Sequence, residues 1–414
     1  MNAERLCPGN DFVFVNHAIY EKYFSPLSPC PNVALYRKGT KRTDWTTMEL
    51  FVQSKRHEYQ DPYHHEFTLD DTTTPSDTSV EAQKQLLQFA AFQWNHQHRL
   101  FAFAVGIYDS RARFFRFDPS SVAVSESFNY RDEPRLLAEF FLRYSTLSPV
   151  ERGFDPTVTP ATGAERELYC SHLKNYLQRV EEKNLRMYPH VERLLAQNVP
   201  VFKIQVNDLD GGVHWYLGSS PAIAIAHARL NSAPCGRLTR GYIATPISPT
   251  EKSEKGKLYW LKDCWRSIRG DSETEKYSHL KNTGVPNLPE LLCGGDVLTD
   301  DELQETENDS LVRYHGVSWT SPASPLQHMV HHRLVQGLLI PLWYVESAKE
   351  LLRAGRDALE SRCSKFVLKI CLTFRVYSDH CCVLQVRHAP SRRQRRQRDV
   401  NRSQKRWVGE VRYS

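Results

Sequence analysis

Two neighbouring stretches of the sequence decide the fold that we expect. Residues 235–244 read CGRLTRGYIA, and after a charged turn at residues 249–257 the chain continues with LYWLKD at residues 258–263. The glycines predict a hairpin whose backbone can approach phosphate groups closely, and Lys262 follows on the next strand, where its ammonium group can pair with them. Taken alone the pattern is weak, because a lysine that ends an apolar strand more often extends along the surface into water.

The helix expected after this strand supplies carboxylates that can partner the lysine. Glu273 lies eleven residues after Lys262 and is followed at helical spacing by Tyr277 and Leu280, which predicts that its face packs inward. A lysine in a half-buried cleft needs charge compensation, so we expect Glu273 to pair with Lys262. Glu275 is the alternative partner.

Short motifs on both sides of this region extend the pattern. Downstream of Lys262 the chain contains Val285-Pro286, Gly294-Gly295-Asp296-Val297, His331-His332-Arg333-Leu334-Val335 and an expected helix at residues 348–359. Upstream it contains Gln97-His98-Arg99, RFFRFD at residues 113–118, Phe128-Asn129-Tyr130 and Gly153-Phe154-Asp155. In this order, over residues 44–359, the motifs resemble the fungal-type protein kinases, a family of kinase-like proteins that is expanded in fungi.

The resemblance implies a kinase-like fold that uses ATP with Mg²⁺ to phosphorylate Ser or Thr hydroxyl groups of proteins. It also places the hinge of that fold near residues 329–340. The nucleotide-binding residues that the resemblance implies are Gly236, Arg237, Thr239, Gly241, Lys262 and Glu273.

The catalytic segments of that family do not occur in this sequence. Neither H-R-D, which supplies the catalytic base, nor D-F-G, which holds Mg²⁺, is found, although 55 residues follow Leu359. Residues 360–414 are rich in Cys and Arg and do not resemble the family. We therefore assign no catalytic and no metal-binding residue, and we expect a truncated, inactive kinase-like chain. The alternative is a non-catalytic, pseudokinase-like scaffold that holds a protein partner.

The distribution of apolar, proline and charged residues, together with the resemblance to this family, predicts an α+β protein in four parts. We expect an N-terminal α/β module at residues 1–154 and a stretch of linker and helices at residues 155–200. A kinase-like small lobe with the start of the large lobe should follow at residues 201–359. Residues 360–414 are expected to form a disordered basic tail.

The periodicity of the apolar residues predicts individual elements within these parts. A proline-rich stretch at residues 146–162 is the clearest linker candidate, and the helical pattern at residues 164–198 is interrupted near Pro189. The expected strands and the first helix are a strand at 49–53, a helix at 81–95, a hairpin of strands 100–108 and 111–117, and strands at 201–206, 213–217 and 258–261.

The overall composition is that of an ordinary globular protein. The chain has 414 residues, of which 40% are hydrophobic and 25% charged, with a formal net charge of +6. Residues 387–406 contain nine Lys or Arg and one Asp, so the rest of the chain carries a charge of about −2. Contact with nucleic acid is therefore expected only through the basic tail.

The cysteines and the apolar stretches bear on the cellular compartment. Ten cysteines are scattered along the chain without a C-x-x-C pair, which favours reduced thiols over a disulfide framework or a zinc site. No secretory signal and no apolar stretch of membrane-spanning length is recognisable. We expect an intracellular protein, cytoplasmic or nuclear, without a membrane segment.

Two further residue sets carry weaker hypotheses. Asp44, Gln53 and Lys55 resemble the acidic residues and lysine of Mg²⁺-dependent nucleases, but a neutral amide such as Gln53 is a poor Mg²⁺ ligand, which favours a structural or substrate-docking role. None of three histidine clusters combines i, i+4 helical spacing with a carboxylate in the manner of H-E-x-x-H, so packing is favoured over metal binding. These clusters are His64-His65, His96 with His98, and His328 with His331-His332.

Overall fold

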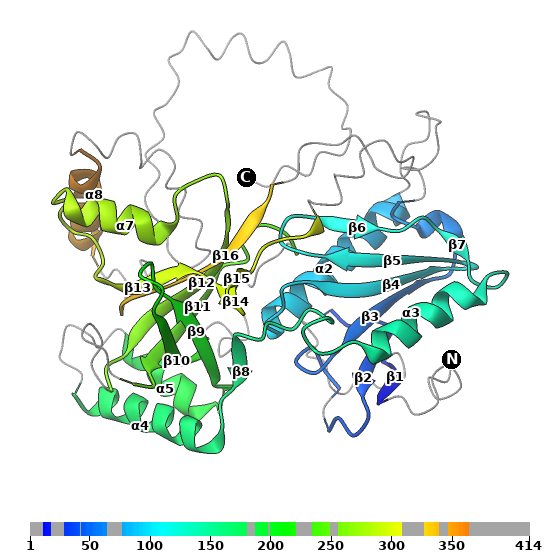
Figure 1. The fold of residues 1–414 in the computed structure, drawn as a ribbon, viewed down its shortest axis with the longest axis horizontal. Helices are drawn as coiled ribbons and strands as arrows, with labels where there is room; N and C mark the ends of the chain where they lie inside the picture. Colours follow the sequence, from blue (N-terminus) through cyan, green and yellow to red (C-terminus); the bar gives the residue numbers. More distant parts are fainter. Residues whose placement is uncertain are drawn as a thin grey trace, which may run out of the picture. The chain divides into compact units, whose positions relative to one another are not determined.

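The fold is known from a computed structural model, shown in Figure 1. It describes residues 11–17, 29–41, 43–63, 77–179, 187–197, 199–220, 234–248, 256–308, 327–338 and 347–363. Contacts between residues divide the chain into two units, Met1–Ile340 and Pro341–Ser414. The second unit is described only around helix α8 (Ala348–Cys363), which confirms the helix predicted at residues 348–359. Most of the expected basic tail lies outside the described residues.

The first sheet has seven strands in the order β1-β2-β3-β4-β5-β6, with β7 paired to β5. β3 and β4 are parallel, and helix α2 (Asp77–His96) lies between them in the chain, so this part is a mixed α/β arrangement. The strands are β1 (Phe12–Asn16), β2 (Val33–Arg37), β3 (Leu50–Lys55), β4 (Ala102–Tyr108), β5 (Arg111–Phe117), β6 (Val122–Val124) and β7 (Phe128–Asn129), and a short helix η2 (Glu58–Gln60) follows β3.

Helices cover both faces of this sheet (Figure 1). Helix α2 buries Leu86, Phe89 and Ala90, which recur at helical spacing and pack with Phe51 and Phe115 of the sheet. Helix α3 (Pro134–Thr146) buries Leu137, Phe141 and Tyr144 against the opposite face. The helix predicted at residues 81–95 is thus confirmed and is longer by a few residues at its N-terminal end.

The hairpin predicted between residues 100 and 117 is also confirmed. Tyr108 of β4 pairs with Arg111 of β5, so Asp109 and Ser110 alone form the turn. Asp109 adopts a left-handed backbone conformation with φ of 53°, which Asp tolerates better than most residues do.

The second sheet also has seven strands, in the order β13-β16-β12-β11-β10-β9-β8. Every neighbouring pair is antiparallel. Two short strands, β14 (Leu298–Thr299) and β15 (Glu302–Leu303), form a separate pair. The strands of the large sheet are β8 (Val158–Pro160), β9 (Phe202–Asn207), β10 (Val213–Ser219), β11 (Arg240–Pro246), β12 (Tyr259–Ser267), β13 (Leu291–Asp296) and β16 (Met329–Gly337).

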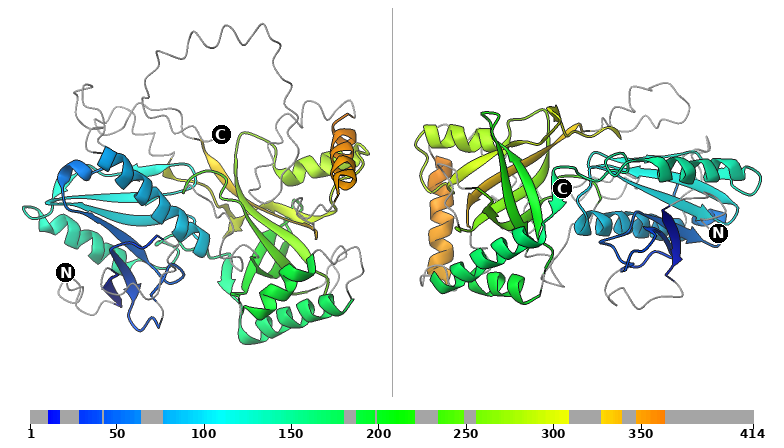
Figure 2. Two further views of the ribbon diagram at one scale, coloured as in Figure 1. Left: turned by 180° about the vertical axis from the view of Figure 1, so that it is seen from behind. Right: turned by 60° about the horizontal axis from the view of Figure 1, so that its bottom comes forward.

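The second sheet is strongly curled, which gives it an inner and an outer face (Figure 2). A Cβ atom at Gly295 of β13 would lie only 3.0 Å from the carbonyl oxygen of Asn207 in β9, so the two sides of the sheet approach each other. The inner face packs around Ile204, Tyr242 and Leu261. Helices α4 (Gly163–Arg179), α5 (Tyr188–Ala196) and α7 (Glu273–Asn282) pack against the outer face.

Some elements differ from the sequence-based expectation. The proline-rich stretch 146–162 is not a simple linker, because it contains β8, which joins the second sheet beside β9. Pro189 lies in the first turn of α5, where its missing N–H group is not needed, and residues 180–186 before it lie outside the described ranges. β12 extends through Lys262 to Ser267, beyond the predicted end at residue 261.

Among the helices in the described ranges, none is both long and apolar enough to cross a membrane.

Candidate functional site

Lys262 lies in the middle of the second sheet. Its strand, β12, pairs with β11 and β16, and Lys262 is directly opposite Gly241 on one side and Leu334 on the other. Because side chains alternate along a strand, Lys262 and Cys264 point to the outer face, whereas Asp263 and Trp265 point to the inner face. Two adjacent charged residues therefore enter different environments.

Lys262 forms an ion pair with the helix that follows its strand. Its Nζ atom donates to Oε1 of Glu273 at 2.9 Å and to Oε2 at 2.7 Å. Burial raises the pKa of Glu273, but the charge and the hydrogen bonds of Lys262 outweigh burial, so the pKa lies below its usual value. The pairing expected from the eleven-residue spacing is present.

The local structure of α7 explains why Glu273, and not Glu275, pairs with Lys262. Ser272 precedes the helix and its side chain accepts a hydrogen bond from the N–H group of Glu275, whose carboxylate in turn accepts one from the N–H group of Ser272. This reciprocal capping box uses Glu275 to satisfy backbone groups at the start of the helix. Glu273, the first residue of the helix, is left to face β12.

Arg237 adds a second positive charge to the pair. Its Nη2 atom lies 3.6 Å from Oε2 of Glu273, and its side chain is 39% exposed, compared with 10% for Lys262. The thiol of Cys264 is buried beside this group; burial raises its pKa, and the charges of Lys262 and Arg237 partly offset that effect. Two cations thus share one carboxylate, and Arg237 connects the group to solvent.

The predicted glycines have structural roles. Gly236 has a φ of +107°, and its N–H group donates to the carbonyl oxygen of Pro119 at 2.8 Å. A Cβ atom at Gly241 would lie 2.1 Å from the indole ring of Trp260, so glycine is required there for packing. Thr239 is half-buried immediately before β11. Residues 221–233, between β10 and Gly236, lie outside the described ranges.

Helices α4 and α5 cover the apolar part of the face that carries Lys262. Ile243 and Leu217 are completely buried in a cluster with Tyr169 and Val191 of these helices, and Trp260 packs against the same cluster. The hydroxyl group of Tyr169 donates to the backbone carbonyl of Ile243 at 2.8 Å. On this face of the sheet, α7 therefore packs beside Lys262, whereas α4 and α5 pack beside Trp260.

A buried network of charges occupies the other face of β12. Nη2 of Arg333 donates to Asp155 at 2.6 Å, and its Nε donates to Asp263 at 3.4 Å. His331 bonds to Asp263 and, at 2.6 Å, to Gln304. Burial raises the pKa values of both Asp residues, but Arg333 and His331 outweigh it and hold them well below the usual range. The ring of His331 also stacks on Trp265.

Sequence reasoning did not anticipate this network. Asp155 lies in the proline-rich stretch that was expected to be a linker, and it is 178 residues from Arg333. The available signal was that Asp263 and Arg333 come soon after apolar or aromatic residues in strands that are almost entirely buried, since charged residues are seldom fully buried without a partner.

The histidine clusters take part in packing and hydrogen bonding. His98 accepts or donates a hydrogen bond to Tyr242 at 2.8 Å, and burial lowers its pKa to about 3. His332 bonds to Asp296 at 2.9 Å, and His328 bonds to Glu305 at 2.9 Å. His96 bonds to a carbonyl of its own helix. His64-His65 lie outside the described residues, and within those that are described no group of His, Cys, Asp and Glu could hold a metal ion.

The residues compared with nucleases do not meet in the first sheet. Asp44 bonds to Thr46 in the loop before β3, whereas Gln53 and Lys55 lie three and five residues into β3, roughly 10 Å and 17 Å beyond its first residue at the usual rise of a strand. Gln53 is buried and donates to the carbonyl of Ala82 in α2 at 2.8 Å. Gln53 therefore has a structural role here.

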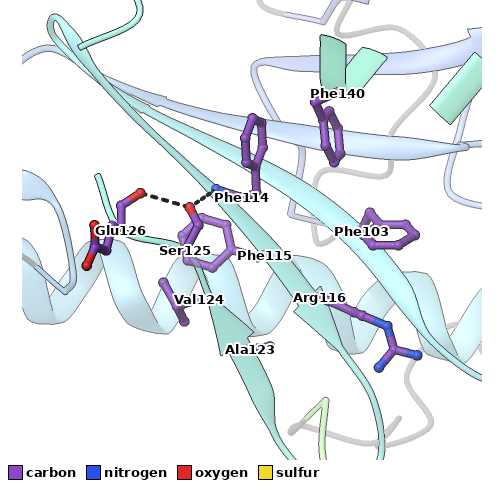
Figure 3. A pocket seen from close by; sticks show the side chains of 9 residues that line it. All are labelled: Phe103, Phe114, Phe115, Arg116, Ala123, Val124, Ser125, Glu126 and Phe140. Carbon is purple, nitrogen blue, oxygen red and sulfur yellow. Dashed lines mark hydrogen bonds between the residues drawn. The ribbon is translucent and has the colours of Figure 1, made fainter. Parts of the chain in front are cut away.

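A pocket of about 470 Å³ lies on the first sheet, and Lys262 is not among the residues that line it (Figure 3). Phe103, Phe114 and Phe140 form much of its wall. Arg116, its cationic residue, already bonds to Glu307 at 2.6 Å and to Asn308, so its charge is compensated. The other polar side chains of the lining are Ser125, whose hydroxyl group already bonds to the backbone, and Glu126.

Comparison with known proteins identifies one family. Residues 48–196 match the model of the fungal protein kinase family, which confirms the resemblance over this segment of the chain. The match begins just before β3 and ends with α5, so Lys262 lies beyond it. No curated protein and no solved structure shows significant similarity to the chain.

Proposed function

We propose that residues 199–338 form a kinase-like small lobe that binds the phosphate groups of ATP without transferring them. The ion pair between Lys262 and Glu273 carries this proposal. A lysine on the strand after a glycine-containing hairpin, paired with a glutamate of the next helix, is the arrangement that protein kinases use to hold ATP phosphates. The family match to residues 48–196 supports the same relationship.

The side chains around Lys262 suit a phosphate group. The ammonium group of Lys262 supplies a point charge, and Glu273 fixes its direction through two hydrogen bonds. Arg237 can turn its planar guanidinium towards a phosphate, because its side chain is 39% exposed. With two cations and one carboxylate, the group carries a net positive charge that favours an anion.

Transfer of the phosphoryl group is not part of the proposal. The sequence contains neither the H-R-D nor the D-F-G segment that supply a base and a Mg²⁺ ligand in kinases. The described residues also offer no carboxylate cluster for a metal ion, so they do not fit a resident Mg²⁺ site. Mg²⁺ would reach the site bound to the nucleotide. Phosphorylation of Ser or Thr hydroxyl groups of proteins would need a catalytic base and a Mg²⁺ ligand supplied by another chain.

Thermal unfolding of the full chain with and without millimolar Mg-ATP tests this function. ATP at 100 times its dissociation constant should stabilise the protein by about 2.7 kcal/mol. Lys262→Met should abolish the shift, whereas Lys281→Met, an exposed lysine at the end of α7, should keep it. A cooperative transition that Mg-ATP does not shift would contradict the proposal.

A non-catalytic scaffold is the second candidate, and the position of α4 and α5 favours it. A nucleotide base next to Lys262 would need apolar surface on the same face, but Ile243 and Leu217 are already buried beneath these helices. Inorganic triphosphate separates the two cases, because it carries the phosphates without a base. Equal stabilisation by triphosphate and ATP would indicate an anion site without base recognition, and no stabilisation by either would favour the scaffold.

A further inference from the structure

Residues 235–240 connect the candidate site to the N-terminal part of the chain. The N–H group of Gly236 donates to Pro119 in the turn between β5 and β6 at 2.8 Å. Nη1 of Arg240 donates to the carbonyl oxygen of Gln97, just after α2, at 2.9 Å. The first sheet and its helix therefore hold this segment at both ends.

The backbone of the segment is strained between these two attachments. Leu238 has a φ of +43°, in the left-handed region that a bulky residue rarely adopts. Its side chain is buried in a cluster with Trp94 of α2, Trp265 of β12 and Met329 of β16. Because Trp94 belongs to the first sheet's helix, docking of the first part of the chain helps to hold Leu238 in this conformation.

The same segment determines where Arg237 lies. The carbonyl oxygen of Arg237 accepts a hydrogen bond from the N–H group of Trp265 at 2.7 Å, and its guanidinium lies 3.6 Å from Glu273. The segment thus places the second cation on the carboxylate of the Lys262 pair. Cys264, whose side chain is on the Lys262 face, is only 1% exposed in this arrangement.

We propose that the N-terminal part of the chain acts as a conformational switch on the candidate site through residues 235–240. In the docked state Leu238 is held against Trp94 and Arg237 lies on Glu273. On release the segment relaxes, Arg237 leaves Glu273, and Cys264 becomes accessible. The two states differ in specific contacts, which is what a two-state device requires. Because Arg237 lies beside Lys262 only in the docked state, an anion that binds both cations would favour that state. This effect of an anion is the only part of the proposal that rests on the proposed function.

Alkylation of the full chain by N-ethylmaleimide, followed by mass spectrometry of each cysteine peptide, tests the switch. Leu238→Gly removes both the strain and the side chain that contacts Trp94, and should increase the alkylation rate of Cys264 at least tenfold. Cys293 serves as an internal reference, because it is buried in the inner face of the second sheet. Asn308→Ala is the second variant. It loosens the turn of Pro119 from outside the segment, because the side-chain amide of Asn308 donates to the carbonyl oxygens of Arg116 and Ser121.

Leu137→Ala is the matched control, because it removes a buried side chain of α3 that contacts neither Leu238 nor the site. It should leave Cys264 protected. The proposal is overturned if Cys264 stays protected in both Leu238→Gly and Asn308→Ala, or if Cys293 becomes reactive together with Cys264, which would indicate general unfolding. Alkylation requires no nucleotide, so it decides the switch even if Mg-ATP fails to stabilise the protein.

Discussion

Lys262 and Asp263 are adjacent in the chain, yet they belong to two different kinds of charged site. Asp263 lies on the inner face of the second sheet with Arg333, Asp155 and His331, and the side chains of all four are at most 3% exposed. Lys262 lies on the outer face, where Glu273 balances it and the second cation, Arg237, is 39% exposed.

The difference between these sites separates a closed structural network from a group of charges that lies next to solvent. Around Asp263 every charge has partners inside the protein, including the carbonyl oxygen of Gln205 and the hydroxyl group of Thr157, which both accept from Arg333. Both ring nitrogens of His331 are engaged in hydrogen bonds, one with Gln304 and one with Asp263. The network has no capacity left for a ligand, whereas the Lys262 site retains a net positive charge next to solvent.

Removal of Arg333 should have the largest effect. Arg333→Met leaves Asp155 and Asp263 buried without their main counter-charge, and should lower the free energy of unfolding by about 3–5 kcal/mol. Denaturation by urea measures the loss. Arg131→Met, which breaks an exposed ion pair with Asp109, is the control and should barely change the midpoint. Equal effects of the two variants would show that the inner network does not stabilise the fold.

Acid should weaken the fold through the buried carboxylates. Burial raises the pKa of Asp296, but hydrogen bonds from His332 and Arg266 outweigh it and lower the pKa from 3.8 to about 2. Because the pKa is lower in the folded state, the stabilisation is complete above about pH 4 and is lost as the pH falls towards 2. Because Asp296 is partly exposed and solvent screens its charge, this stabilisation is on the order of 1 kcal/mol.

Asp296→Asn tests this pH dependence. Its unfolding free energy should vary less between pH 4 and pH 2 than that of the wild type, as followed by circular dichroism in urea. Asp271→Asn, an exposed residue before α7, should retain the wild-type slope. A slope unchanged by Asp296→Asn would mean that other carboxylates account for the acid sensitivity.

The smallest expected change in stability comes from substitution of the two glutamates at the start of α7, which should behave differently. Glu275→Ala removes one half of the capping box and should lower the stability by about 0.5–1 kcal/mol, without changing the shift that Mg-ATP produces. Glu273→Ala should abolish that shift, because Lys262 loses the partner that orients it. If Glu275→Ala abolished the shift and Glu273→Ala did not, the assignment of the pair would be wrong.

Local patterns were sufficient to predict many elements. The apolar spacing of residues 81–95 identified α2, and Asp109-Ser110 between two apolar runs identified the β4–β5 hairpin. The pairing of Lys262 with Glu273 was also predictable, since a strand, a turn and the first residue of a helix leave few alternatives. In each case the decisive residues lie within about twenty positions of one another.

Contacts between distant residues could not be predicted in this way. The hydrogen bond of Gly236 to Pro119 and the strained backbone of Leu238 depend on a neighbouring sheet more than 100 positions earlier in the chain. Glycine is needed at position 241 because a side chain there would meet the indole ring of Trp260. From the sequence we had expected this glycine to let the backbone approach a phosphate group. The cover that α4 and α5 form over Ile243 had no sequence signal that we recognised.

The sequence by itself determined the α+β class, several of the strands and helices, the family resemblance and the Lys262–Glu273 pair, because these depend on local periodicity and short spacings. Only the tertiary structure decided that Asp155 crosses to Arg333, that Arg237 joins Glu273, and that helices cover the apolar part of the Lys262 face. The physical reason is that the free energy of a charge or an apolar side chain depends on which distant groups surround it after folding.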